Sequence, residues 1–510
     1  MTVKIQRILF WCILLIVILV RLLNLDKGMS ADEGWLWRRG HVPISEFLAW
    51  MLKGSSVFPP LSPFLFKIWL VFGSSEIWAR LYFVFFGTSL CVLIYHIGKH
   101  CIDRWYALIV FFISSLSPLL ISSSQLIRSY IDSSFWMVLS MFLLLKGFQS
   151  GFSLKLKLGY VAATVLSLWS SYLSGFIWLS QNLFYFVFNF ADKEKRKQWL
   201  CMQAIIIILF LPCLFFLYHQ LYFARGIHER WNVLGLHVLG FNLGQYARGL
   251  GAVLGLDPEF LSQHPLTKIF NSYQLFFASF AGIFIFVLLC FKSFKNLHER
   301  LNYKMVSYFF LLHVFFSIVI FFIFVELTHF PLVPRYFIVQ HVLFIFVIAG
   351  LFYPLRQFKK VSIACGFIIM TTVYGSRIPE AVKPSFEMKK AATFLKGHMT
   401  SEDCVLMVRN TNRYIESIPE RITYINQDYQ LDSTHESYRN SEYLQKVDST
   451  LKLIPVSCQR LWFHRIEGND ELLGANKTVL ERLSLYGYQQ TGLHQFKRVD
   501  LIVFERKKDY

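Results

Sequence analysis

The sequence predicts a polytopic α-helical membrane protein that carries a small soluble α/β domain at its C-terminal end. The first observation is the composition: hydrophobic residues make up 55% of the 510 residues, and charged residues make up only 16%. Average soluble chains carry about 25% charged residues. A soluble protein this apolar could not cover its surface with polar groups, and its mean hydropathy of +0.46 agrees. The composition therefore excludes a soluble enzyme, a disordered chain and a fibrous repeat.

The second observation is the length of the apolar runs. A helix needs about 20 apolar residues to cross the hydrocarbon core of a membrane. We expect eleven spans, at residues 8–25, 78–98, 105–123, 130–146, 158–174, 176–191, 199–219, 273–291, 305–327, 336–354 and 360–375. A further apolar segment, 61–73, is too short to span the membrane and is expected to form an interfacial helix.

The third observation is the distribution of the basic residues. Lys and Arg gather in the short loops that lie inside the cell if the N-terminus is cytoplasmic, and the positive-inside rule favours this orientation. Residues 1–375 then form the membrane domain, with 26–77 and 220–272 as its two long outer loops. Residues 376–510 then form an extracytoplasmic domain. We expect a multi-pass protein of the bacterial inner membrane whose C-terminal domain is periplasmic.

The net positive charge of the chain lies in its membrane part. The chain has 51 Lys and Arg against 32 Asp and Glu, and the excess lies mainly in residues 1–380. This pattern indicates basic loops that face anionic lipid rather than a nucleic-acid partner.

Arg21 lies inside the first span, where a charge is costly. Its side chain either reaches to the outer interface or has a role inside the bundle.

The C-terminal segment has a different pattern, which predicts a small α/β domain. The expected elements are helices at 386–397 and 470–486 and strands at 403–409, 459–464 and 496–505. Cys404 and Cys458 both lie in this segment, and the sequence is consistent with a disulfide or with two buried free thiols. The chain has no Cys-x-x-Cys and no His-Glu-x-x-His motif, so no metal site is expected.

The most informative feature for function is the pair Asp32-Glu33, which follows the first span. Two adjacent carboxylates beside a bilayer must be solvated, paired or used. Partial desolvation and a neighbouring negative charge make a carboxylate a stronger base, which suits general-base chemistry near neutral pH. The alternative is a solvated acidic turn that caps the next helix.

Arg and Tyr residues fall on the same side of the membrane as Asp32 in this topology. Arg128 and Tyr130 lie at the outer end of the third span, and Arg335 and Tyr336 lie at the outer end of the ninth. Because Arg binds phosphate in a bidentate manner, these pairs predict a site for an anionic lipid headgroup. For each arginine alone, the alternative is an anchor that faces bulk phospholipid.

The order of these motifs resembles the GT-C glycosyltransferases of family 39. That family includes protein O-mannosyltransferases and the bacterial transferase that adds aminoarabinose to lipid A. The resemblance covers residues 1 to about 375 and is carried by Asp32-Glu33, Pro59-Pro60-Leu61, the segment from Lys67 to Arg80, Arg128-x-Tyr130 and Arg335-Tyr336. The chain has Phe58 where bacterial members often have His, and Leu126 where they often have Glu. Either departure could alter the acceptor pocket without removing the candidate base.

The resemblance implies an inverting transfer of a sugar from a polyprenyl-phosphate donor to an acceptor on the outer face of the membrane. Asp32 would take the acceptor proton and Glu33 would support it, while Asp132 would be a second carboxylate or the start of a helix. The resemblance implies no metal and no cofactor, and it implies that the lipid-linked sugar is a substrate. The expected partners are membrane lipids, this donor, and an acceptor lipid, glycan or protein.

The donor phosphate would meet several basic and aromatic side chains. The residues assigned to it by the resemblance are Arg128, Tyr130, Arg335, Tyr336, Lys67 and Arg80, the last two with interfacial anchoring as the alternative. Tyr130 and Tyr336 would donate hydrogen bonds.

Three rival functions remain open. An O-antigen-type ligase or polymerase would have a dominant outer loop and no Asp-Glu pair after the first span. A transporter would have charged or broken helices near the midplane and internal repeats, and the sequence pattern indicates neither. An inactive scaffold with the same fold would have no need for Asp32 and both Arg-Tyr sites.

Overall fold

The computed structural model describes residues 3–53, 58–189, 192–233, 253, 303–328, 334–353, 378–384, 387–407, 422–424, 441–455, 457–466, 470–497 and 499–506. The chain divides into two compact units, which are described one at a time. The first unit comprises Met1–Leu25, Val57–His219 and Phe241–Val382. The second comprises Asp26–Ser56, Gln220–Gly240 and Lys383–Tyr510. The expected spans at 273–291 and 360–375 lie outside the described residues.

The described part of the first unit is helical. Its elements are α1 (Val3–Leu22), α4 (Leu61–Leu70), α5 (Glu76–Cys101), α6 (Arg104–Leu116), α7 (Pro118–Ser124), α8 (Ile131–Ser150), α9 (Leu154–Ser170), α10 (Ser174–Asn189), α11 (Lys193–Val233), α16 (Tyr303–Thr328), η1 (Pro334–Phe337), α17 (Ile338–Phe352) and α19 (Ile378–Ala381). α11 continues into the second unit from Gln220. α4 has ten residues, which agrees with the expected short helix.

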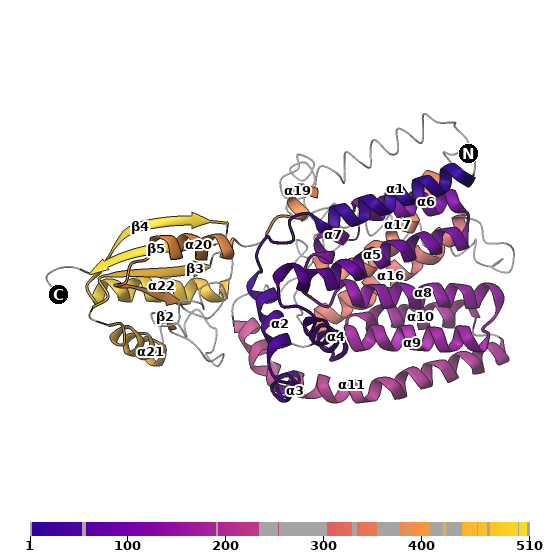
Figure 1. Ribbon diagram of the computed structural model, residues 1–510. Coiled ribbons are helices and arrows are strands. Elements are labelled where there is room, and N and C mark those ends of the chain that lie inside the picture. Colours follow the sequence, from indigo (N-terminus) through magenta and orange to yellow (C-terminus); the bar gives the residue numbers. More distant parts are fainter. Residues whose placement is uncertain are drawn as a thin grey trace, which may run out of the picture. The chain divides into compact units, whose positions relative to one another are not determined.

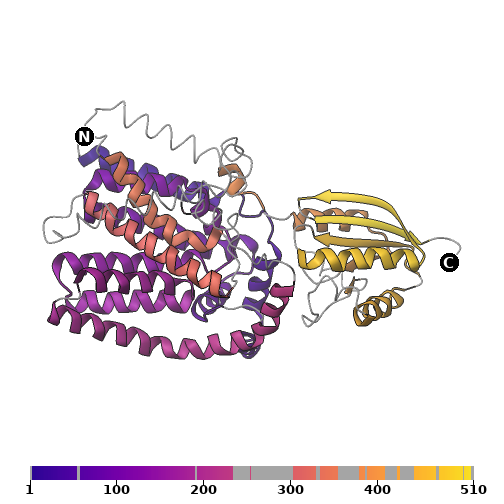
Figure 2. The same cartoon turned by 180° about the vertical axis from the view of Figure 1, so that it is seen from behind.

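Several of these helices are long and apolar enough to cross a membrane. Five meet the requirement alone within the described residues, namely α1, α5, α8, α16 and the Lys193–Gln220 part of α11. The helices run side by side as a bundle, in which α5 packs on α6, α7 and α8, α8 packs on α9, and α16 packs on α10 and α17 (Figures 1 and 2). The predicted fold class, a polytopic helical membrane protein, is confirmed.

The expected span 105–123 is not one continuous helix. α6 ends at Leu116, α7 begins at Pro118, and the two helices are bent by 62°. In an α-helix the carbonyl of Ser114 would accept from the N–H four residues later, but Pro118 has no N–H. The sequence interpretation that the helices are unbroken is therefore wrong at this place, and the last carbonyls of α6 need other donors.

Arg21 of α1 supplies those donors from inside the bundle. Its side chain is completely buried, and its Nη atoms donate to the carbonyls of Ser114 and Ser115, each at 3.4 Å. It also donates to Ser124 Oγ of α7 at 3.2 Å and to Cys91 Sγ of α5 at 3.1 Å. A positive charge at the C-terminal end of α6 is favourable for the helix dipole as well. Of the two interpretations of this arginine, the structure has the one inside the bundle.

A glycine on α5 makes room for this contact. A Cβ atom at Gly87 would lie 2.0 Å from Ser124 Oγ and 2.6 Å from Ser124 Cβ. Real Cβ atoms do not approach other atoms so closely, so α5 and α7 could not pack at this distance with any other residue. Gly87 therefore permits the short approach that brings Ser124 to Arg21.

We predict that Gly87→Ala lowers the thermal unfolding temperature of the protein in detergent. Overpacking of a close-packed interior costs about 1–3 kcal/mol, and here it also pushes Ser124 away from Arg21. The matched control is Gly175→Ala on α10, because a Cβ there meets nothing within 4 Å. Equal unfolding temperatures for the two variants would contradict the prediction.

The second unit holds an N-terminal pair of short helices, the end of α11 and an α/β part with a mixed sheet. The pair is α2 (Ala31–His41) and α3 (Ile44–Lys53), whose Trp35 and Trp50 rings pack edge to face at 4.9 Å. The α/β part comprises α20 (Met388–His398), β1 (Asp403–Met407), β2 (Ile422–Tyr424), α21 (Ser441–Lys452), β3 (Arg460–Ile466), α22 (Asp470–Leu485), β4 (Tyr488–Phe496) and β5 (Val499–Arg506).

The sheet has the strand order β2-β1-β3-β5-β4 (Figure 1). β1 is parallel to β2 and β3, whereas β5 is antiparallel to β3 and β4. All five expected elements of this domain are present, and their ends lie within three residues of the predicted ends. The sequence interpretation missed α21, β2 and β4. β4 was missed because most of its side chains are exposed and polar, so no apolar run marks it.

A buried carboxylate holds the start of β1. Asp403 is 2% exposed and accepts hydrogen bonds from Arg460, from Trp462 Nε1 at 3.0 Å and from Thr400. Burial acts to raise the pKa of Asp403, but the hydrogen bonds from Arg460 and Trp462 hold it below the usual range. The nearby Cys404 and Cys458 are buried free thiols joined by a hydrogen bond, so the structure has the unbonded form of this pair.

We predict that the α/β domain loses stability between pH 6.5 and pH 4 through His464. Burial in β3 lowers the pKa of His464 to about 4, so at pH 5 the unfolded state binds a proton that the folded state excludes. The loss between pH 7.5 and pH 5 is about 2 kcal/mol. Asp403 does not contribute in this window, because its stabilisation is lost only as the pH falls through its lowered pKa.

Hydrogen exchange of β3 and β5 peptides in the full-length protein measures this loss, after correction for the intrinsic pH dependence of exchange. His464→Leu should reduce the difference between pH 7.5 and pH 5, whereas the half-buried His494→Leu should not. An unchanged pH dependence in His464→Leu would show that another group is responsible.

Candidate functional site

The predicted Arg128-Tyr130 motif forms a buried turn between α7 and α8. Gln125, at the start of the turn, donates to the carbonyls of Arg21 and Leu23 at 3.1 and 2.8 Å. The turn continues through hydrogen bonds from the N–H of Arg128 and from the N–H of Tyr130, and Tyr130 is the N-cap residue of α8. The motif is therefore tied to the end of α1.

Phe58 has a direct relation to Arg128. Its ring centroid lies 5.1 Å from the guanidinium carbon of Arg128, within the range of a cation–π interaction. Arg128 is only 6% exposed, so the aromatic face compensates part of the cost of burying its charge. Phe58, which stands where members of the resembled family often have His, thus stabilises the charge of Arg128.

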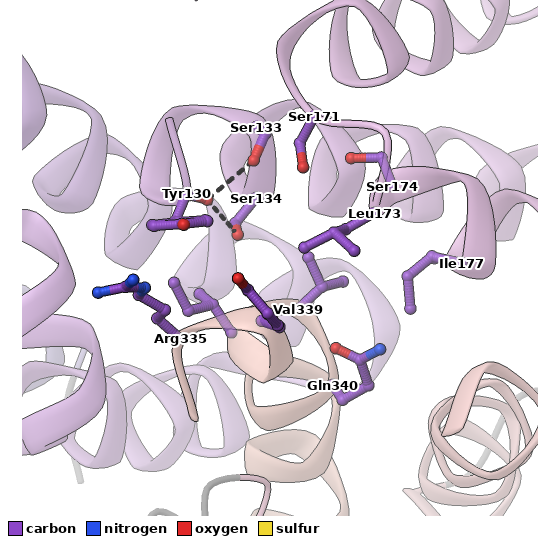
Figure 3. A pocket seen from close by; sticks show the side chains of 12 residues that line it. Tyr130, Ser133, Ser134, Ser171, Leu173, Ser174, Ile177, Arg335, Val339 and Gln340 are labelled. Atoms are coloured by element: carbon purple, nitrogen blue, oxygen red, sulfur yellow. Dashed lines mark hydrogen bonds between the residues drawn. The ribbon is translucent and has the colours of Figure 1, made fainter. Parts of the chain in front are cut away.

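The second predicted motif lies beside the first. Arg335 and Tyr336 lie on η1, which leads into α17. The guanidinium carbon of Arg335 lies 5.5 Å from the centroid of the Tyr130 ring, and the Tyr130 and Tyr336 ring centroids are 5.9 Å apart. Of the residues that the sequence assigned to the donor phosphate, these three are brought together, and Figure 3 shows Tyr130 and Arg335 among them.

These three residues line a small, partly open pocket with a cavity volume of about 20 Å³, which is room for about one water molecule. The other lining residues come from the ends of α8, α9, α10 and α17 and from the turn between α9 and α10: Ser133, Ser134, Ser171, Leu173, Ser174, Ile177, Ile338, Val339 and Gln340. Among the described lining residues, Arg335 is the only charged one. The rest of the wall is made of hydroxyl groups, one amide and apolar side chains.

Sequence reasoning missed the serines and the glutamine. Ser133 and Ser134 lie near the start of one expected span, Ser171 and Ser174 lie at the end of the next, and Gln340 lies within another. In those places the sequence pattern does not distinguish them from ordinary helix residues. A cluster would have been visible only in three dimensions, since Ser134 and Gln340 are separated by 206 positions in the chain. The sequence itself shows only that serines occur near the ends of neighbouring expected spans.

Asp132 is buried in the first turn of α8. This position agrees with the alternative that Asp132 starts a helix. Its Oδ2 accepts from Ser62 Oγ of α4. Its Oδ1 has no hydrogen-bond partner among the described residues. Asp132 does not line the pocket, although it lies two residues after Tyr130.

The remaining basic candidates of the first unit lie elsewhere. Lys67 is half-buried on α4, and Arg80 is completely buried on α5. Beside them, Trp69 and Trp78 stack at 4.6 Å, and each indole donates to the carbonyl of the other residue. This pair joins the end of α4 to the start of α5. Lys67, Arg80 and Arg128 do not line the pocket.

Asp32 and Glu33 lie in the second unit, in the first turn of α2. Ser30 and Glu33 form a capping box: Ser30 Oγ accepts from the N–H of Glu33, and Glu33 Oε2 accepts from the N–H of Ser30 at 2.9 Å. Glu33 is 4% exposed, whereas Asp32 is exposed. The acidic pair therefore divides into a carboxylate that caps the helix and one that faces outward.

The described residues contain no group of three or more His, Cys, Asp or Glu that could hold a metal ion. The pocket offers a guanidinium, hydroxyls and an amide, which are groups that bind phosphates and sugars through hydrogen bonds.

The amino-acid sequence matches no protein-family model and no curated protein. Solved structures match it. Cupriavidus metallidurans ArnT bound to undecaprenyl phosphate is similar at a TM-score of 0.54 and 13% identity, over 98% of both chains. The Archaeoglobus fulgidus oligosaccharyltransferase tethered to an acceptor peptide is similar at a TM-score of 0.54 and 14% identity, over 98% of this chain and 74% of that one.

The Archaeoglobus fulgidus oligosaccharyltransferase AglB, in complex with an inhibitory peptide and a dolichol-phosphate, gives a TM-score of 0.50 at 14% identity over 98% of this chain and 74% of that one. At these identities the likeness concerns the fold. The chain therefore shares the fold of these structures, and its long apolar helices identify it as an integral membrane protein.

We predict that Glu33→Ala destabilises the first turn of α2. Loss of a capping interaction costs about 1 kcal/mol, so hydrogen exchange of the peptide at residues 31–36 should be faster. Asp32→Asn keeps the capping box and should leave exchange at wild-type rates. If both substitutions speed exchange equally, Asp32 also has a structural role.

Proposed function

We propose that the protein is an inverting glycosyltransferase of the GT-C family 39 type. It moves a sugar from a polyprenyl-phosphate donor to an acceptor lipid, glycan or protein on the outer face of the membrane. The proposed location is the bacterial inner membrane, with a cytoplasmic N-terminus and a periplasmic C-terminal domain.

The observation that carries this proposal is the meeting of Arg335, Tyr130 and Tyr336 at one pocket. A half-buried guanidinium is suited to a phosphate, because it provides charge and a planar set of donors in a region of reduced dielectric. The two phenols beside it can donate further hydrogen bonds. The fold shared with proteins solved in complex with undecaprenyl phosphate and dolichol-phosphate supports the same class of donor.

In the proposed reaction Asp32 takes the proton of the acceptor hydroxyl. The acceptor oxygen forms a bond to the anomeric carbon, and the bond from that carbon to the phosphate oxygen breaks with its electron pair. Polyprenyl phosphate leaves as a stable anion, so no strong general acid is needed. A single displacement inverts the configuration at the anomeric carbon. The donor sugar is a substrate, and the proposal includes no cofactor.

The geometry of α2 suits this role for Asp32. The side chain is exposed at the N-terminal turn of a helix that Glu33 and Ser30 hold in place. Because Glu33 is committed to the capping box, Asp32 is the carboxylate of the pair that can meet an acceptor. Glu33 then acts as a positioning residue.

Arg128 and Asp132 have supporting roles in this proposal. Arg128 and the Phe58 ring stabilise the turn that presents Tyr130. Asp132, bonded to Ser62, stays a candidate second carboxylate. Lys67 and Arg80 are retained as candidates for the lipid headgroup only.

The broken helix and the buried arginine are features that a transporter could also have. Here five hydrogen bonds from Arg21 go to groups of α1, α5, α6 and α7. Arg21 donates to the carbonyls that the helix break leaves without donors, and those carbonyls stabilise its charge. The break and the arginine therefore have a structural role and do not form an ion pathway. The transferase therefore stays the favoured function.

We predict that Asp32→Asn abolishes sugar transfer while folding and donor binding stay normal. The amide cannot accept the acceptor proton but keeps the shape of the side chain. The measurement is mass spectrometry of lipids that co-purify with the wild type and with the variant in mild detergent. A glycosylated polyprenyl phosphate should be found, and it should be enriched in Asp32→Asn because turnover is blocked.

The matched control is Asp26→Asn, an exposed aspartate of the same loop, which should behave as the wild type. Full transfer activity of Asp32→Asn would remove Asp32 as the base. If wild type and variant carry only bulk phospholipid even when loaded with synthetic donor, the transferase proposal fails.

A further inference from the structure

We propose that Cys404 and Cys458 are a disulfide site, whose two thiols join when the α/β domain folds in an oxidising compartment. The structure holds the reduced form of this site, in which both cysteines are thiols. The inference does not use the transferase function. Its setting in the cell uses the proposed periplasmic location of the domain, so the site and the location need separate tests.

The register of the sheet places Cys404 on the face of β1 that it shares with Leu461 of β3, its partner across the ladder. Asp403 lies on the opposite face, because successive side chains of a strand alternate, and its carboxylate accepts from Trp462 of β3. Cys404 and Leu461 both belong to the buried core of the domain. The thiol of Cys404 is therefore enclosed between the sheet and its covering elements.

Cys458 lies in the turn that leads into β3. Its N–H donates to the carbonyl of Pro455 at 2.9 Å, and its Sγ donates to the carbonyl of Arg460 at 3.5 Å. The thiol also forms hydrogen bonds with Cys404 and with the hydroxyl of Tyr488, the first residue of β4. The turn therefore brings the second thiol against the sheet, beside the first.

Direct contact between the two thiols is the observation that carries the proposal. A disulfide requires side chains that point toward each other from Cα atoms closer than about 7 Å. Thiols that share a hydrogen bond point toward each other, so a bond requires a short approach of two side chains rather than a shift of the strands. Buried thiols also serve as small apolar groups, but that role does not require two sulfur atoms to meet.

The bond has a structural consequence for the sheet. It joins β1 to the turn before β3 and closes a loop of 53 residues between the two cysteines. A cross-link over such a loop stabilises a domain mainly by restricting its unfolded chain. The ion pair of Arg460 with Asp403 joins the same ends of β1 and β3, so the disulfide reinforces an existing connection.

The reaction is a thiol–disulfide exchange with an oxidant that carries a disulfide, such as a protein thiol oxidant or glutathione disulfide. One cysteine thiolate attacks a sulfur of the oxidant, which forms a mixed disulfide and releases one thiolate. The second cysteine attacks the protein sulfur of the mixed disulfide, and the bond to the oxidant breaks. Two protein thiols are oxidised, and the oxidant is reduced to two thiols that take up the two protons.

This exchange belongs to folding rather than to the folded domain. The hydrogen bond with Cys404 and burial raise the pKa of Cys458 well above its usual range, which makes the folded thiol a poor nucleophile. Cys404 is 5% exposed and Cys458 is 1% exposed, so an oxidant in solution does not reach them. In the unfolded chain both thiols are accessible, and oxidising compartments keep the bond once it has formed.

The first experiment tests the site on the purified full-length protein in detergent. Urea opens the α/β domain in the presence of glutathione disulfide, the urea is removed, and the remaining thiols are alkylated under denaturing conditions before peptide mass spectrometry. The peptide of Cys404 should be linked to the peptide of Cys458 in most molecules. Cys404→Ala and Cys458→Ala should each abolish the link, whereas Cys201→Ala, an exposed site on α11, should keep it.

Two outcomes of this experiment would overturn the inference. One is a wild type in which both thiols are alkylated or carry glutathione. The other is a link from either cysteine to one of the remaining seven cysteines of the chain.

The second experiment compares the oxidised and reduced wild type, so it does not depend on the folding of a variant. Hydrogen exchange of the β1 and β3 peptides should be at least about tenfold slower in the oxidised form. Oxidant-treated and reduced Cys404→Ala should exchange at equal rates. Equal rates for the two forms of the wild type would show that the bond does not fit the folded domain, and the inference would fail.

The third experiment tests the location. Acid trapping and alkylation of whole bacteria that produce the protein should show the pair already linked. A reduced pair in the cell, together with a linked pair in the first experiment, would keep the disulfide site and contradict the proposed periplasmic location of the domain. Neither result changes the test of the transferase, which is made on Asp32.

Discussion

The arrangement of the first unit depends on the satisfaction of a helix break inside an apolar bundle. Pro118 removes an N–H from the ladder that joins α6 to α7, and the carbonyls of Ser114 and Ser115 then need donors in a region without water. Arg21 provides them from α1, and Gly87 lets α5 approach closely enough to complete the contact. The charge of the arginine is tolerated because its donors go to carbonyl, hydroxyl and thiol acceptors, including the negative end of the α6 dipole.

The candidate site follows from this arrangement. Gln125, one residue after α7, bonds to the backbone at the end of α1, so the turn that carries Arg128 and Tyr130 has one position relative to α1, α7 and α8. η1 then places Arg335 against Tyr130. In the proposed function, an arginine that binds the donor phosphate gains from such rigidity, since its donors are aimed before the ligand arrives.

Sequence patterns identified much of this protein because the residues concerned act locally. Apolar length predicted the spans, and helical or strand patterns predicted five elements of the α/β domain. For the Asp-Glu pair the sequence left two alternatives, a general base with its support or an acidic turn that caps the next helix. The structure has Glu33 in a capping box and Asp32 exposed. The strand β4 escaped because a strand with a polar exposed face has no apolar run.

The sequence by itself therefore determined the membrane class, the mixed C-terminal domain and the identities of the charged residues at the helix ends. These properties follow from composition and from periodicity along one segment. Only the tertiary structure decided that Arg21 is buried, that the α6–α7 span is broken around it, and that Tyr130, Arg335, Ser134 and Gln340 share one pocket. Those facts depend on contacts between segments far apart in the chain, and such contacts leave no local pattern because each residue satisfies its hydrogen-bonding and packing needs through a partner on another helix.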